Sequence, residues 1–397
     1  MKKIKQIIRS TLIFAAILSF ASCKNNNIKG KILGDYVVEL PVYTSLDYDK
    51  ALKSDNENYG KFGCTGVVKT LENGETIIGR SYDLGYSFKP AYVVRTAVPG
   101  FHKTVGYVYN TFAGPDFEDV KKNGLSSDDA ATIPFFTGEL MNDAGFYAEA
   151  NMRPSEPEST GIKESSGTNP GAEYRMTFAA LIRFMGERAG SVDEALKIAN
   201  SVDVHNFKTE HTSWGGGIIL ADSTGHYGVL ELVDNKLVWS DMANAHANFY
   251  INDEYREKSA YRMGLGRYEV VKAGIDSVKN EEDMKTLIRK VQYRQMTYDA
   301  ATCQFNPLGE IQAEYREDWK PWGGMLTYKD AYDPANKDFI MSVIAKDNDF
   351  AQHATDKEMR EAGYWQSAWQ SVANCNKKTL KVTFFENEDL SFDLTVE

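Results

Sequence analysis

Two strand-like runs joined by an Asn-Gly turn constrain this chain more than any other stretch. The first run begins at Cys64, and the second carries Arg80 and Asp83 near its end. Asn-Gly between two such runs is typical of a tight β-hairpin. Because the end of the second strand returns beside the start of the first, we expect Arg80 and Asp83 to lie next to Cys64. A guanidinium beside a thiol favours the reactive thiolate, so the sequence predicts a reactive cysteine here.

The first 23 residues have the pattern of a targeting segment. Basic residues precede a short apolar stretch over residues 11–20, and small residues stand directly before Cys23. This pattern resembles the lipidation site of bacterial lipoproteins, with Phe20 where leucine is usual. We therefore expect residues 1–23 to be a signal peptide and Cys23 to carry a lipid. The protein would then be exported to the periplasm, the outer membrane or the cell surface, and its N-terminal lipid would hold it to a membrane. An ordinary secretory signal is the alternative.

Residues 24–63 are interpreted as a tether followed by a pro-segment. A polar stretch over residues 24–32 precedes a short strand expected over residues 36–40, and a second polar stretch leads to Gly63. A cut between Gly63 and Cys64 would separate the lipid on Cys23 from residues 64–397. The main domain would then stay at the membrane only if the pro-segment remained packed on it.

Composition excludes several classes of function. The net charge is −11, and no basic run follows the N-terminus, so we expect no nucleic-acid partner. The histidines lack the spacing of zinc ligands, so we expect no metal. No later apolar stretch is long enough to cross a membrane. Cys303 and Cys375 either pair in a disulfide or are simply buried apolar residues.

The order of expected elements indicates an α+β fold, because strands and helices come in separate blocks. Residues 153–171, which are rich in Pro, Ser, Gly and Glu, are expected to form a long exposed loop. Ser191 and Glu194 form a capping-box pattern that opens a helix. Strands are expected over residues 91–98, 105–109, 217–222, 227–232, 236–239, 339–345, 364–372, 380–386 and 390–396, a strand–turn–strand unit over 135–151, and helices over 177–188, 191–200, 254–274 and 280–294.

The hairpin motif resembles the opening of a known enzyme family. Cys64-Thr-Gly, followed by Gly79-Arg-x-x-Asp-x-x-Tyr-Ser-Phe, is similar to the N-terminus of choloylglycine hydrolases and penicillin V acylases. These N-terminal-nucleophile hydrolases cleave linear amides without a cofactor and have a four-layer αββα sandwich. The resemblance implies that Cys64, freed by cleavage at Gly63, is the nucleophile. Its own α-amine, with a pKa of roughly 7.7 to 8.0, would be the base.

The resemblance also assigns roles to the neighbours of Cys64. Arg80 would stabilise the thiolate and the acyl intermediate, and Asp83 would hold the α-ammonium through a charge-assisted hydrogen bond. The segment around Asn151 resembles the one that supplies an oxyanion-hole amide.

Two further site residues come from later segments. The resemblance implies a second site asparagine that stands close before an aromatic residue. Asn248 is favoured for this role, with Asn244 as the alternative. Arg267 fits the last family arginine better than Arg262 does. His246 lies close by and is interpreted as a structural histidine.

The expected function is therefore hydrolysis of an N-acyl compound of the bile salt, penicillin V, or N-acyl amino acid or lipid type, through a thioester. The partner is a small-molecule amide. Acyl transfer to an amine on the same fold is one alternative, and a non-catalytic surface lipoprotein that binds an acyl ligand is another. The sequence leaves open whether the chain forms a homo-oligomer.

Overall fold

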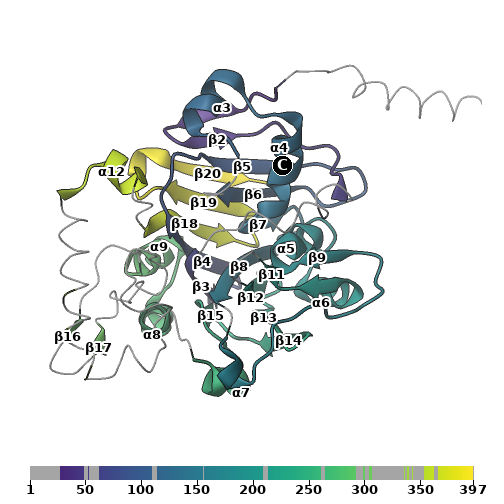
Figure 1. Ribbon diagram of the computed structural model, residues 1–397, viewed down its shortest axis with the longest axis vertical. Helices are drawn as coiled ribbons and strands as arrows, with labels where there is room; N and C mark the ends of the chain where they lie inside the picture. The colour runs from purple at the N-terminus through teal and green to yellow at the C-terminus, as the bar shows by residue number, and fades with distance from the viewer. Residues whose placement is uncertain are drawn as a thin grey trace, which may run out of the picture.

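Two large β-sheets form the body of the protein (Figure 1). The computed structural model describes residues 27–48, 52, 62–109, 114–154, 156–208, 213–260, 264–291, 298–299, 304–305, 335, 338, 342, 353–361 and 365–396. The expected signal peptide and Cys23 therefore lie outside the described residues. Within the described part of the chain, no helix is long and apolar enough to span a membrane.

The larger sheet has ten strands and is antiparallel except where β2 pairs with β5. Its order is β1-β2-β5-β6-β7-β8-β12-β13-β14, and β11 also pairs with β12. The strand bounds are β1 Lys31–Gly34, β2 Val37–Glu39, β5 Ala91–Thr96, β6 Thr104–Tyr109, β7 Glu139–Asn142, β8 Tyr147–Pro154, β11 Phe207–Lys208, β12 Ser213–Ala221, β13 Tyr227–Val233 and β14 Lys236–Asp241. The expected strand over residues 36–40 is thus β2, which belongs to this sheet.

The smaller sheet has six strands in the order β15-β3-β4-β18-β19-β20. Its bounds are β3 Phe62–Thr70, β4 Thr76–Gly85, β15 Ala245–His246, β18 Trp365–Asn374, β19 Thr379–Phe384 and β20 Ser391–Thr395. The predicted hairpin is β3–β4, and its turn contains Gly74 at a φ of 85°, a backbone conformation that glycine adopts without steric cost. Residues 365–396 thus return to this sheet, where β18 pairs with β4 and is followed by β19 and β20.

Helices pack on both sheets. Helices α8 and α9 contact β3, β4 and β18 of the smaller sheet, α5 contacts β7 and β8 of the larger one, and β3 contacts β8 (Figure 1). The α+β class is confirmed, and these contacts run in the order helix, sheet, sheet, helix. The helices are α3 Phe117–Asn123, α4 Ser127–Thr132, α5 Phe178–Gly186, α6 Val192–Ser201, α7 Asp253–Lys258, α8 Leu265–Gly274, α9 Glu281–Arg289 and α12 Asp356–Glu361. Short elements are the 3₁₀ turns η1 Ile133–Phe136, η2 Glu158–Thr160, η3 Ile275–Ser277 and η6 Glu388–Leu390, and the strand pairs β9 Arg175–Thr177 with β10 Asp203–His205 and β16 Tyr298–Asp299 with β17 Gln304–Phe305.

The hairpin β3–β4 separates two apolar clusters. Val68 and Ile78 belong to the cluster that includes residues of the larger sheet, whereas Val67 and Ile77 pack with α8 and α9. Successive side chains of a strand point to opposite faces. One face of the hairpin is therefore the inner face, toward the larger sheet, and the other is the outer face, toward the helices.

Several expected elements differ in detail. The unit expected over residues 135–151 begins with η1 rather than a strand, because Pro134 at its start fixes a helical φ. The helix expected over 254–274 is divided into α7 and α8, since Ser259 leaves the helical conformation and Gly264 has a φ of 84°. The loop over 153–171 contains η2 and the buried Ile162. The strand expected over 339–345 lies outside the described residues, apart from Ser342.

Candidate active site

Cys64 and Arg80 lie together on the inner face of the hairpin. The antiparallel register pairs Cys64 with Tyr82 and Gly66 with Arg80. Both Cys64 and Arg80 are completely buried, and Nη2 of Arg80 lies 3.8 Å from Sγ of Cys64. The guanidinium is fixed from the larger sheet, since it donates to the carbonyl oxygen of Gly138 and, at 2.6 Å, to that of Ala150. The positive charge is therefore held at a defined position beside the thiol.

Burial outweighs this charge in the uncut chain. Desolvation raises the pKa of the Cys64 thiol to about 11, although Arg80 acts in the opposite direction. Arg80 thus lowers the pKa of the thiol, as expected from its position, but its charge does not offset the exclusion of water from this closed site. A base must take the thiol proton, or solvent must enter, before the sulfur becomes nucleophilic.

Asp83 lies on the outer face of the hairpin and not beside the thiol. It lies three positions after Arg80, and side chains an odd number of positions apart along a strand point to opposite faces. Its Oδ1 accepts hydrogen bonds from Ser81 at 2.9 Å and from Ser367 at 2.7 Å. Its Oδ2 accepts one from Nη1 of Arg267 at 2.8 Å, and this buried ion pair links β4 to α8. Asp83 is thus connected to the cysteine through Arg267.

Asn248 connects the two faces at the cysteine itself. Continuing the register of β15 on β3, in which His246 pairs with Gly66, places Asn248 opposite Cys64. Its Oδ1 accepts from the backbone nitrogen of Cys64 at 2.8 Å and from Nη2 of Arg267 at 3.0 Å. Two donors converge on this atom, so the amide oxygen faces the cysteine. Its Nδ2 donates to the carbonyl oxygen of Met152 at 2.6 Å.

Asn244 is the alternative to Asn248, and Arg262 is the alternative to Arg267. Asn244 accepts a hydrogen bond from Lys272 at the surface, 2.7 Å away, and its backbone carbonyl pairs with Val68. Arg262 lies outside the described residues. Arg267 also donates to Oγ1 of Thr65 at 3.0 Å, so it contacts the strand that carries the cysteine.

Asn151 comes from the facing strand β8 and is completely buried. Its Nδ2 lies 3.2 Å from Nδ1 and 3.3 Å from the carbonyl oxygen of His246. Burial lowers the pKa of His246 to about 3, so the ring is neutral at ordinary pH. Since Nε2 of His246 lies 3.1 Å from the carbonyl oxygen of Phe249, the proton belongs on Nε2 and Nδ1 accepts from Asn151. The histidine thus orients the amide of Asn151.

The sequence analysis singled out Asn151 on β8 but missed the other buried polar residues on the same face of that strand, Tyr147, Glu149 and Arg153. Alternate positions of β8 carry Tyr147, Glu149, Asn151 and Arg153, all of them buried. The intervening residues are the apolar Ala148, Ala150 and Met152. Polar side chains at every second position of an otherwise apolar strand are the signal that could have identified this face, because burying them requires partners.

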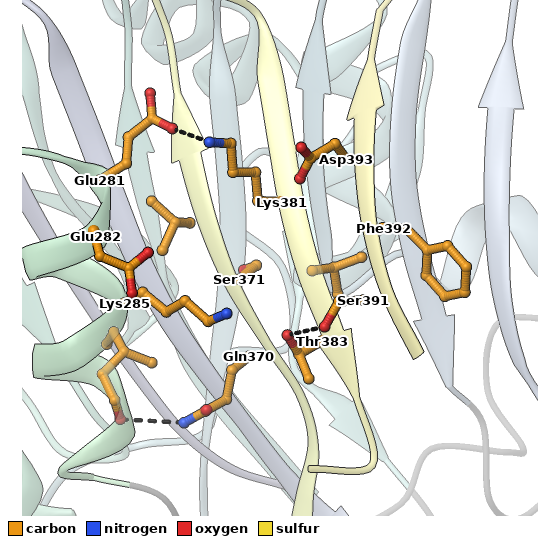
Figure 2. Close-up of a pocket in the computed structure, with 13 residues that line it drawn as sticks. Glu281, Glu282, Lys285, Gln370, Ser371, Lys381, Thr383, Ser391, Phe392 and Asp393 are labelled. Carbon is orange, nitrogen blue, oxygen red and sulfur yellow. Dashed lines mark hydrogen bonds and ion pairs between the residues drawn. The ribbon is translucent and has the colours of Figure 1, made fainter. Parts of the chain in front are cut away.

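The described residues leave little room beside the site. A cavity of about 20 Å³ is lined by Tyr82, Phe136, Thr137, Gly138, Ala150, Met152 and Ala179. This volume suits a water molecule rather than a substrate. A larger pocket of about 300 Å³ lies between α9 and strands β18 to β20, where Gln370 donates to Ile288 and Glu281 pairs with Lys381 (Figure 2). It opens on the outer face of the sheet, whereas Cys64 faces inward, so it is not the site of the cysteine chemistry.

No metal centre is found in the described part of the chain, where no three His, Cys, Asp or Glu side chains are placed to share an ion. The other described cysteine, Cys375, is free and buried, while Cys303 lies outside the described residues. Desolvation raises the pKa of Cys375 well above its ordinary value, and Asp222 adds to this effect. Cys375 is therefore a buried thiol beside a carboxylate, in contrast to Cys64 beside a guanidinium.

Known proteins offer only distant similarity. No family model matches the chain, and no curated protein matches it. Among solved structures, the chain is similar to two variants of conjugated bile acid hydrolase from Clostridium perfringens, with 13% identity, TM-scores of 0.43 and 0.42, and coverage of 84% of this chain and 92% of theirs. It is also similar to penicillin V acylase from Agrobacterium tumefaciens, with 15% identity, a TM-score of 0.37, and coverage of 82% and 84%. These are the two kinds of enzyme suggested by the motif around Cys64. Since all these values are low, a function must rest on the side chains around the cysteine.

Proposed function

We propose that this protein is a cysteine N-terminal-nucleophile amidohydrolase that cleaves a linear amide bond of an N-acyl compound. One observation carries the proposal: side chains from separate elements hold both the thiol and the backbone nitrogen of the same buried residue. Arg80 lies beside Sγ of Cys64, and Asn248 accepts from its nitrogen. A cysteine that only fills space needs neither contact, whereas a nucleophile whose own amine is the base needs both.

The first step is processing at the Gly63–Cys64 bond. The sulfur of Cys64 attacks the carbonyl carbon of Gly63, the C–N bond breaks as a thioester forms, and the thiol proton passes to the leaving nitrogen. Water then hydrolyses the thioester, which releases the carboxylate of Gly63 and restores the thiol. The freed α-amine, with a pKa of roughly 7.7 to 8.0, can then act as a base near neutral pH.

Hydrolysis of the substrate repeats this chemistry on an amide from solution. The α-amine takes the thiol proton, and the thiolate attacks the amide carbonyl carbon. Collapse of the adduct breaks the C–N bond, and the α-ammonium gives its proton to the leaving amine. Water, deprotonated by the α-amine, attacks the thioester, the C–S bond breaks, the acid leaves and the thiol re-forms. Arg80 stabilises the negative charge on sulfur throughout.

The asparagines have different parts in this scheme. Asn151, whose Nδ2 is oriented by His246, is the donor that we assign to the oxyanion. Asn248 presents its oxygen to Cys64 and its Nδ2 to Met152, so in the uncut chain it positions the future amine. It joins Asn151 at the oxyanion only if its amide turns after cleavage. Asp83 acts through Arg267, which fixes the oxygen of Asn248.

The acyl half of the substrate is expected to be apolar. The small cavity next to Arg80 is lined mainly by Tyr82, Phe136, Ala150, Met152 and Ala179. The cavity has room only for water in this closed state, so an acyl group would enter as the site opens, and these apolar side chains would then desolvate it. Bile salts, penicillin V and N-acyl amino acids or lipids are the amides to screen first.

We also propose that the chain is exported and carries a lipid on Cys23. The support is the sequence of residues 1–23, with its basic start, apolar stretch and small residues before the cysteine. Mass analysis of the N-terminal fragment tests this directly, since a lipid adds the mass of its acyl chains to a peptide that begins at Cys23. An unmodified fragment, or one that begins elsewhere, would overturn the assignment.

The test of the catalytic proposal compares three purified chains: wild type, Cys64→Ala, and Cys375→Ala as the matched buried cysteine. N-terminal analysis and intact mass should show that wild type and Cys375→Ala begin at Cys64, while Cys64→Ala keeps the preceding segment. If the wild type stays uncut, the mechanism fails and a binding lipoprotein is the better description. If it is cut, product analysis of an N-acyl amide with and without an added amine distinguishes hydrolysis from acyl transfer.

A further inference from the structure

A chain of three oxygen-bearing side chains lies buried behind Arg80. The hydroxyl oxygen of Tyr147 is 2.9 Å from Oε1 of Glu139 and 2.5 Å from Oε2 of Glu149. All three side chains have no exposed surface. Oε2 of Glu149 is also 3.6 Å from Nε of Arg80, while its Oε1 has no hydrogen-bond partner. Two carboxyl groups thus share one hydroxyl group beside the guanidinium that contacts Cys64.

The number of protons in this chain can be counted. A tyrosine hydroxyl has one proton and can donate to only one of the two carboxyl oxygens. If both glutamates were ionised, one of the two short oxygen–oxygen contacts would have no proton between its atoms. Such a contact between lone pairs is repulsive in a buried, low-dielectric site. The three side chains must therefore share a second proton, and one of the two carboxyl groups carries it.

The contacts place that proton on Glu149. The carboxylate of Glu139 is well supplied with donors, since Ser371 donates to its Oε1 at 2.6 Å and Trp369 donates to its Oε2 at 2.9 Å. Apart from Tyr147, only the side-chain amide of Asn151 and the more distant Arg80, among the described residues, favour the ionised form of Glu149. The consistent arrangement is that Glu149 donates to Tyr147 and Tyr147 donates to Glu139. Burial, together with the charge of Glu139, raises the pKa of Glu149 to about 7.

The effect of the charge of Arg80 on Cys64 depends on this proton. With Glu139 ionised and Glu149 neutral, the buried group of Arg80 and the two glutamates has no net charge, and the guanidinium can stabilise an additional negative charge on Cys64. If Glu149 ionises, that group already has one excess negative charge. A thiolate 3.8 Å from the guanidinium would then be a second one. Opposite charges within a few ångströms shift pKa values by about 1 to 3 units, so the effect on the thiol is large.

We propose that Glu149 is a positioning residue that is held as a neutral acid. Its ionisation offsets the positive charge of Arg80 and so makes the thiol of Cys64 less reactive. The proposal rests on the proposed function, because it concerns the reactivity of the same cysteine. The charged and titratable groups around Glu149 are Arg80 and Tyr82 on β4, Cys64 on β3, Glu139 on β7, Tyr147 on β8 and, on the outer face beyond Cys64, Asp83 and Arg267.

The protonation of Glu149 can be measured without any substrate. A protonated carboxyl group has a C=O stretching band in the infrared that a carboxylate lacks. The difference spectrum between wild type and Glu149→Gln should contain this band at about pH 5 and lose it by about pH 9, since an acid with a raised pKa is neutral below it and ionised above it. Should Glu149→Gln fail to fold, Tyr147→Phe serves instead, because loss of the bonded hydroxyl shifts the same band. Absence of the band at the lower pH would overturn the proposal.

The effect on Cys64 is read from its alkylation by iodoacetamide, with the Cys64 peptide quantified by mass spectrometry. Glutamine has the shape of the neutral acid and its amide can donate to Tyr147. We expect Glu149→Gln and wild type to react at the same rate at about pH 5, and the variant to react about tenfold faster at about pH 9, as a shift of one unit in the thiol pKa predicts. Glu231→Gln is the matched control, since Glu231 is also fully buried but is bonded to the backbone of Ile251 and Asn252.

The outcomes separate the two proposals. Equal rates for wild type and Glu149→Gln at every pH, or the same change in Glu231→Gln, would overturn the role of Glu149. An uncut Gly63–Cys64 bond in the same samples would overturn the proposed function instead, and the infrared measurement would still decide whether Glu149 is neutral.

Discussion

The segment before the proposed cleavage site is built into the fold, and we expect it to remain bound if the chain is cut there. Strand β2 pairs in parallel with β5, with Val37 opposite Ala91 and Glu39 opposite Val93. The pairing continues beyond the strand, since the nitrogen of Leu40 donates to the carbonyl oxygen of Val93 at 3.0 Å. If residues 27–48 left, the edge of β5 would be exposed to other chains.

Side-chain contacts of the residues that follow β2 extend the attachment. The hydroxyl of Tyr43 donates to the carbonyl oxygen of Ala130 at 2.8 Å, and that of Tyr48 donates to Glu187 at 2.6 Å. The ring of Tyr48 also packs edge-on against Phe184 at 5.5 Å between centroids. The segment therefore contacts both the sheet and its helices, as a permanent part of the fold would.

The binding free energy of the cut segment can be gauged from the buried side chains of β2 and of the residues that follow it. Val37 and Val38 have no exposed surface, and Leu40 is 2% exposed. Truncating a buried leucine to alanine costs about 2 to 5 kcal/mol. A loss of about 2 kcal/mol already weakens binding of the cut segment about 30-fold. Val42, in the same segment, is 51% exposed, so Val42→Ala is the matched control and should change binding by less than about 0.5 kcal/mol.

The assay uses a specific protease site introduced over residues 53–58 of the Cys64→Ala chain, so that cutting does not depend on the cysteine. After the cut, size-exclusion chromatography and intact mass should show the N-terminal fragment with the main domain, and urea should release it. Leu40→Ala should lose the fragment on dilution, whereas Val42→Ala should keep it. Release of the fragment from an otherwise folded wild type, or equal release from both variants, would refute the reasoning.

Two further predictions concern the packing around the cysteine. Arg267→Met removes the buried cation that pairs with Asp83 and should lower the free energy of unfolding in urea by about 3 to 5 kcal/mol, whereas Arg256→Met, in an exposed ion pair, should cost less than about 1 kcal/mol; similar losses would contradict the buried network. Gly66→Ala would make its Cβ collide with Oε1 of Glu149, so we expect thermal unfolding to report a loss of at least about 1 to 3 kcal/mol. Gly190→Ala, whose Cβ would have its nearest contact at 3.4 Å, should be close to neutral. A well-tolerated Gly66→Ala would mean that the two sheets are not as close there as the structure places them.

The sequence alone predicted the hairpin and the position of Arg80 beside Cys64. The Asn-Gly turn fixes the register of β3 on β4, and the register brings Arg80 to the inner face beside Cys64. The period of two along a strand also contains the information that Asp83 must lie on the opposite face, although the expectation placed both residues beside the thiol. Local turn chemistry and strand alternation act over a few residues, so they can be read without a fold.

Contacts between distant segments were decided only by the tertiary structure. Asn248 faces Cys64 because β15 pairs with β3 at the edge of the sheet, and no local pattern distinguishes it from Asn244. The proton that we assign to Glu149 exists only because packing of one sheet on the other buries two carboxyl groups around a single hydroxyl. Sequence specifies which groups a chain carries and which face of a strand they occupy. Their protonation and reactivity depend on desolvation and on charges brought close by the fold, which is why the hairpin around Cys64 could be predicted from the sequence but the role that we propose for Glu149 could not.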